Sequence, residues 1–176
     1  HKKVLDRLRR DFTEGSEDTN DMMFTRQRIR WKQTKRGRVL EVDQDLAVEE
    51  LSLVPFDKKA KDDEKVSAAL HTQFRSVLGQ LNWLQSRTQF HIAYSFSRVA
   101  SASAGPTIGD VKALNKVVRQ VQAKPMRLRF WPLKGKLRIL GCGDASYRNN
   151  EDKSSQRALT IFMAERGVPK RPLVSK

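Results

Sequence analysis

The sequence predicts an α+β fold: an N-terminal β-hairpin, a three-helix middle and the start of an antiparallel sheet. Apolar residues recur at steps of three and four between residues 71 and 123, which is the spacing of one helix face. Apolar and polar residues alternate within 22–42 and again within 126–142, as they do in half-buried strands. Hydrophobic residues make up 38% of the 176. This apolar content is enough for a core. The length of the chain is enough for one domain or one and a half small domains.

The N-terminal region begins with apolar side chains at helical spacing in residues 1–12, so we expect the last turns of a helix there. Residues 13–21 are polar and acidic and predict a loop. The segments 22–33 and 35–42 predict two short strands, with Gly37 at the turn between them. Together they predict a β-hairpin.

An acidic stretch follows the hairpin. Asp43 can cap a short helix, which Pro55 stops, and residues 57–65 predict an exposed linker of mixed charge. Between Glu41 and Glu64 there are nine acidic residues against three lysines. We therefore expect this stretch to face away from any nucleic acid.

The middle of the chain predicts three helices, the third running from about Thr107 to Ala123, where Pro125 ends it. Their expected apolar faces are Phe74, Val77, Leu78, Leu81 and Leu84; Ile92, Phe96, Val99 and Ala100; and Val111, Leu114, Val117, Val118 and Val121.

The C-terminal part changes to alternating basic and apolar residues. Segments 126–131 and 136–142 predict two strands of one small antiparallel sheet, and 158–164 predicts a further strand. The expected regions of the whole chain are thus 1–56, 57–124, 125–165 and a basic tail, 166–176.

The charge balance points to a polyanionic partner. Thirty-five Lys and Arg against 20 Asp and Glu give a formal net charge of +15. Each basic contact to a phosphate releases condensed counterions, so such a surplus favours nucleic acid. A generic basic protein, such as a ribosome-associated one, and an anionic membrane surface are the alternatives.

Other classes of protein are disfavoured. Cys142 is the one cysteine, so no intramolecular disulfide can form, which fits an intracellular, reducing compartment, cytoplasmic or nuclear. No apolar run reaches the length of a membrane span, and no signal peptide is visible. Because the chain begins at His1 rather than Met, we expect a fragment, a processed product or an incomplete gene model.

The candidate nucleic-acid contacts lie in a stretch without acids. Between Val111 and Gly143 there are nine Lys and Arg and no Asp or Glu. Cations there can neutralise phosphates, and an aromatic face can stack a base. Of the adjacent Phe130 and Trp131, we expect one to be buried and one accessible. The candidate contacts are Lys112, Lys116, Arg119, Arg127, Arg129 and Trp131.

Asp144 is the candidate catalytic and metal-binding residue. It follows an apolar strand within Gly-Asp-Ala-Ser, where a carboxylate can hold a divalent cation near a phosphate, although a simple turn Asp also fits. Two-metal hydrolysis needs several such carboxylates, and Glu151 and Asp152 fall in an expected loop, so the metal site is incomplete. His1, His71 and His91 have no metal-ligand spacing, and zinc is therefore not expected.

A family resemblance rests on residues 74–101, FRSVLGQLNWLQSRTQFHIAYSFSRVAS. This block resembles a copia-type retrotransposon pattern in which Tyr-Arg-Ser-Leu-Val-Gly-Ser-Leu precedes Tyr-Leu, Thr-Arg-Pro-Asp-Ile-Ala-Tyr and Ser-Arg. The segments PTIGDVKALNKVVRQVQ (106–122) and KLRILGCGDASY (136–147) resemble the next helix and the first ribonuclease H strand. The family's Arg-Pro-Asp is absent at 87–91, and its Ser-Asp-Ala-Asp is Gly-Asp-Ala-Ser here.

The resemblance implies the end of a reverse transcriptase palm, a thumb- or connection-like helical region and a partial ribonuclease H-like domain. Asp144 would take the place of the first metal-binding Asp, with Mg²⁺ as the cofactor of the parent enzyme. The implied partners are a template–primer duplex of RNA or DNA and the remainder of the Pol polyprotein. The polymerase Asp pair would lie before residue 1, and the later ribonuclease H acids would lie beyond the tail.

Two functions therefore stay open. The chain is expected to be a reverse transcriptase/ribonuclease H fragment that binds template–primer and is inactive alone. The alternative is a non-catalytic nucleic-acid-binding or assembly module derived from such an element.

Overall fold

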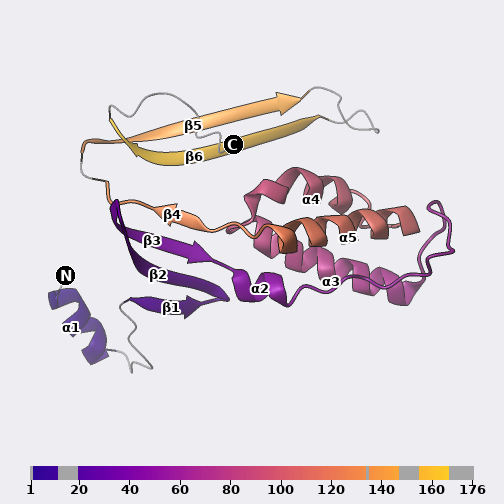
Figure 1. Ribbon diagram of the computed structural model, residues 1–176, viewed down its shortest axis with the longest axis horizontal. Helices are drawn as coiled ribbons and strands as arrows, with labels where there is room; N and C mark the ends of the chain where they lie inside the picture. The colour runs from indigo at the N-terminus through magenta and orange to yellow at the C-terminus, as the bar shows by residue number, and fades with distance from the viewer. Residues whose placement is uncertain (1, 12–19, 134, 147–154, 167–176) are drawn as a thin grey trace. The chain divides into compact units, whose positions relative to one another are not determined.

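The computed structural model describes residues 2–11, 20–133, 135–146 and 155–166. Its α+β architecture confirms the predicted fold class. The chain divides into two compact units, His1–Phe130 and Trp131–Lys176, and each is described by itself (Figure 1).

The first unit begins with helix α1 (Lys2–Asp11), at the place where apolar spacing predicted one; Phe12 lies outside the described residues. Strands β1 (Asp21–Phe24), β2 (Gln27–Thr34) and β3 (Gly37–Asp43) follow as an antiparallel meander. The prediction of a single hairpin was therefore incomplete.

The missed turn lies between β1 and β2. Thr25 and Arg26 have φ angles of 47° and 60°, the left-handed conformation that two-residue hairpin turns require. Neither residue is Gly, Asn or Asp, so composition gave no sign of a turn inside 22–33. The expected turn at Gly37 is present, with a φ of 111°.

Strand β4 (Leu128–Phe130) corrects the predicted topology. We expected it to share a sheet with 136–142, but it pairs with β3, opposite Leu40 to Val42, and completes the order β1-β2-β3-β4. The buried side chain of Gln89 makes two hydrogen bonds to the backbone just before β4. Its Nε2 donates to Met126 O (2.9 Å), and its Oε1 accepts from Met126 N (2.7 Å). The boundary between units consequently falls after Phe130.

A helical layer makes up the rest of the first unit. It contains α2 (Asp45–Glu49), α3 (Ala68–Gln85), the 3₁₀ turn η1 (Phe90–Ile92), α4 (Ala93–Ala100) and α5 (Ile108–Ala123). Helix α2 begins one residue later than predicted, because Gln44 occupies the N-cap while Asp43 Oδ1 accepts from Asp45 N at 3.3 Å. Helix α5 starts with a capping box between Thr107 and Asp110.

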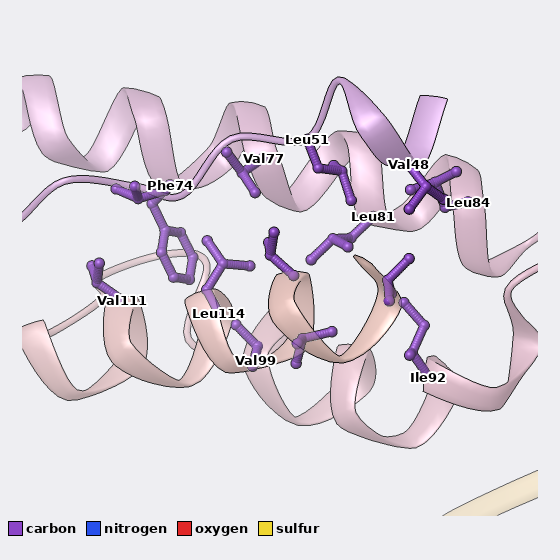
Figure 2. Close-up of a cluster of buried hydrophobic side chains, with 14 of the residues drawn as sticks. Val48, Leu51, Phe74, Val77, Leu81, Leu84, Ile92, Val99, Val111 and Leu114 are labelled. Carbon is purple, nitrogen blue, oxygen red and sulfur yellow. The ribbon is translucent and has the colours of Figure 1, made fainter. Parts of the chain in front are cut away.

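The hydrophobic core lies among these helices (Figure 2). The predicted apolar faces of α3 and α5 are confirmed: the buried members are Phe74, Val77, Leu81, Leu84, Val111, Leu114, Val117, Val118 and Val121, with Leu78 partly buried. Ile92 and Val99 bury the η1–α4 segment against them, as Figure 2 shows. Each residue points inward because helical spacing returns it to one face.

The second unit is a two-stranded antiparallel ribbon of β5 (Leu137–Ser146) and β6 (Gln156–Glu165). The predicted strands at 136–142 and 158–164 are thus confirmed. One face of the ribbon carries apolar side chains that are all exposed: Leu137, Ile139, Leu159, Ile161 and Met163. Glu151, Asp152 and nearly all of the basic tail lie outside the described residues.

Candidate nucleic-acid interface

Helix α5 carries three of the predicted phosphate contacts on the side away from its buried valines. Lys112 is already engaged: its Nζ lies 2.5 Å from Asp62 Oδ1 and 5.6 Å from the ring centroid of Phe56. Lys116 and Arg119 are exposed, and neither has an acidic partner within the described part of the chain. Helix α5 therefore presents two cations that are available to a phosphate.

Arg127 and Arg129, the predicted contacts in β4 and just before it, are both in ion pairs. Arg127 Nη2 lies 2.6 Å from Asp45 Oδ2, and this hydrogen bond raises the pKa of the guanidinium. Arg129 Nε donates to Glu41 Oε2 at 2.9 Å. Binding a phosphate with either arginine would first require separation from its carboxylate.

The acidic stretch supplies the partners of these cations. Within residues 41–64, Glu41, Asp45 and Asp62 contact three of the five predicted cations. The partners are far apart in sequence, 82 residues for Arg127 and 88 for Arg129, so local composition could not reveal them. The expectation that this stretch faces away from nucleic acid stays a prediction.

The four-stranded sheet has one ionic face, which we define by Arg30, Glu41 and Arg129. Glu41 is fully buried, and its oxygens accept from Arg30 (2.9 Å) and Arg129 (2.9 Å) and lie 2.5 Å from Lys32 Nζ. Burial raises the pKa of Glu41, but the hydrogen bonds from Lys32, Arg129 and Arg30 outweigh it and lower that pKa to about 2. Glu41 is therefore ionised at neutral pH and holds three strands together.

The opposite side is the open face, defined by the cross-strand row Trp31, Leu40 and Phe130. A second row, one step along the strands, consists of Met22, Ile29, Val42 and Leu128. None of these side chains is buried. Arg38 lies over Trp31, with its guanidinium carbon 4.5 Å from the ring centroid.

Trp131 is exposed, as a stacking residue must be, but Phe130 is exposed as well. We expected one of the pair to be buried, and this was wrong. Strand β4 is the edge strand of its sheet, and the open face leaves Phe130 52% accessible.

Asp144 lies within β5, opposite Ala158, rather than at a strand end. Its side chain is exposed, and no group of three or more His, Cys, Asp or Glu side chains comes together anywhere in the described residues. A single exposed carboxylate does not fit the donor set that two Mg²⁺ ions need. We therefore derive no catalytic step at this position.

Sequence reasoning missed the Trp31–Arg38 stack, although a signal for it exists. A hairpin with Gly37 at its turn pairs Thr34 with Gly37, which makes Trp31 and Arg38 diagonal neighbours on one face. Sequence reasoning also missed the Glu41 cluster. The same register places Arg30 opposite Glu41, but Arg129 is 88 residues from Glu41 and has no local signal.

No family model matches the chain, and no significant match was found among curated proteins or solved structures. No helix in the described ranges has both the length and the apolar character of a membrane span.

Proposed function

We propose that this chain is a nucleic-acid-binding fragment of a retrotransposon RNA-directed DNA polymerase/ribonuclease H. It would bind template–primer and would be inactive alone. The resemblance of residues 74–101 to copia-type elements supports the family. The cationic face of α5 supports the binding.

The observation that carries the binding proposal is the distribution of ion pairs. Several of the acids are neutralised inside the fold, as Glu41 and Asp45 are, whereas Lys116 and Arg119 project from α5 without an acidic partner in the described residues. The net charge of +15 means that cations outnumber the acids that could neutralise them. A polyanion can then be bound without breaking an internal pair.

The test is a salt-dependent titration of a labelled template–primer duplex by fluorescence anisotropy. The double variant K116A/R119A should bind several-fold more weakly. The slope of log affinity against log salt should fall by about two, because each lost phosphate contact removes about one unit.

A matched control removes two other exposed cations, Lys58 and Lys59, which lie in the mixed-charge linker. The variant K58A/K59A has the same change in net charge and should keep the wild-type slope. Equal effects of the two variants would mean that only net charge matters, and a flat salt dependence of the wild type would remove the proposal altogether.

The second candidate, a non-catalytic module reused from such an element, is favoured by Asp144, which has no metal-binding cluster of carboxylates around it in the described residues. Extending the reading frame separates the two. Flanks with an Asp pair upstream and further acids downstream support the enzyme parent, and intact flanks without them support the module.

For the fragment we expect no magnesium-dependent cleavage of an RNA–DNA hybrid; cleavage abolished by Asp144→Asn would contradict this.

A further inference from the structure

The open face of the four-stranded sheet has features that duplex binding through α5 does not use. Trp31 and Phe130 lie in one row, separated by Leu40, with 39% and 52% of their surfaces accessible. Neighbouring strands are roughly 4.8 Å apart, so the two rings lie roughly 10 Å apart across the sheet. Two exposed aromatic rings on one face of a sheet form a platform on which planar groups can stack.

Charge is sorted between the two faces of this sheet. All three acidic residues in β1–β4, Asp21, Glu41 and Asp43, lie on the ionic face, and each is paired with arginine there. The open face carries Arg38 and no acid within the four described strands. Lys35 and Arg36, in the turn beside Arg38, are exposed too.

We infer that the open face binds single-stranded nucleic acid, with bases stacked on Phe130 and on Trp31, where a base takes the place of the Arg38 guanidinium and Arg38 turns to a phosphate. This deepens the proposed nucleic-acid binding and rests on it. A single strand offers both the base faces that the rings can stack and the phosphates that the cations complement, whereas a duplex hides its base faces. A second copy of the chain would present the same cations to one another, which disfavours pairing through this face.

The experiment compares a labelled oligo(dT) or oligo(U) strand of about 20 nucleotides with a blunt duplex of similar length, by fluorescence anisotropy on the full chain. The variants W31L and F130L keep apolar side chains on the sheet but remove the rings. We expect each to weaken single-strand binding about 10-fold and to leave duplex binding within about 2-fold, because stacking is lost and phosphate contacts remain. The variant W31F keeps a ring and should retain most of the binding.

The matched control is a second tryptophan–arginine stack outside the sheet. Arg87 lies over Trp83 on α3, 4.7 Å from the ring centroid, so Trp83→Leu removes the same kind of pair. It should not change single-strand affinity. Urea denaturation of every variant confirms that the fold is retained.

The outcomes separate this inference from the proposed function. If no oligonucleotide binds, both are overturned. If single strand and duplex bind alike and W31L changes neither, the open face is not a stacking surface, while binding through α5 stands. If sedimentation shows a concentration-dependent dimer that W31A dissociates, a second copy covers the face and the inference is overturned.

Discussion

The helical layer and the β5–β6 ribbon contain the same kinds of apolar side chain in opposite situations. In the layer, Leu81 is fully buried in the core between the helices, whereas in the ribbon Leu159 is 71% exposed (Figure 2). A two-stranded ribbon is at best marginally stable alone in water. Buried apolar contacts therefore stabilise the helical layer, whereas the apolar side chains on the same face of the ribbon as Leu159 are exposed to solvent.

The largest expected effect compares two leucines. Leu81→Ala should lower the free energy of unfolding by about 3–4 kcal/mol, because it removes buried methyl groups and leaves a cavity. Leu159→Ala should change it by less than about 0.5 kcal/mol, because its side chain is already in water. Urea denaturation followed by circular dichroism measures both. Similar losses in the two variants would mean that the ribbon is covered as well as the layer.

A buried and an exposed carboxylate provide a second comparison between the two units. Glu41→Gln leaves three cations around a neutral buried group and should cost about 2–3 kcal/mol, at the low end for a broken buried pair because Lys32 and Arg129 can turn to solvent. Asp144→Asn on the exposed ribbon should cost less than about 0.5 kcal/mol. Equal costs would show that the Glu41 cluster is not a structural centre.

The contribution of Glu41 to stability should also depend on pH. The pKa of Glu41 is lowered in the folded protein from an ordinary 4.5 to about 2. Its contribution is therefore fully present above about pH 4.5 and is lost as the pH falls towards 2. The gap in melting temperature between wild type and Glu41→Gln should narrow over this range. A Glu41→Gln gap that is constant with pH would contradict the lowered pKa.

How far the sequence could predict the fold depends on the range of each interaction. The limits and buried face of α5 follow from a local period and from Thr107 at its start, so they were predicted nearly to the residue. The segment that leads into β4 is held at Met126 by Gln89, a side chain 37 residues earlier, and no periodicity reveals this contact. The turn at Thr25–Arg26 has the conformation of a glycine turn without a glycine, so it was missed too.

The candidate site also contains residues whose exposure follows from local sequence and residues whose pairing depends on distant segments. Lys116 and Arg119 are exposed on α5 because helical spacing turns them away from the valines, and that geometry is local. Arg127 and Arg129 looked equally available in the sequence, but distant carboxylates neutralise both. Net charge led us to expect a polyanionic partner, whereas which of the predicted cations are free of an ion pair depends on tertiary contacts that the sequence does not show.

The smallest expected effect compares alanine substitutions at two helical glycines, one in open space and one against the linker. A methyl group added at Gly79, within α3, would meet no atom within 4 Å, so Gly79→Ala should raise the free energy of unfolding by about 0.5–1 kcal/mol through helix propensity. At Gly109, in the first turn of α5, the same methyl would lie 3.1 Å from Asp62 O, which also accepts from Gly109 N at 2.9 Å. Gly109→Ala should therefore not raise the free energy of unfolding and should lower it by up to about 1 kcal/mol. The reason is that the linker must move, which weakens the hydrogen bond from Gly109 N to Asp62 O. Urea denaturation of both variants measures the difference, and stabilisation by both would show that the linker does not pack tightly against α5.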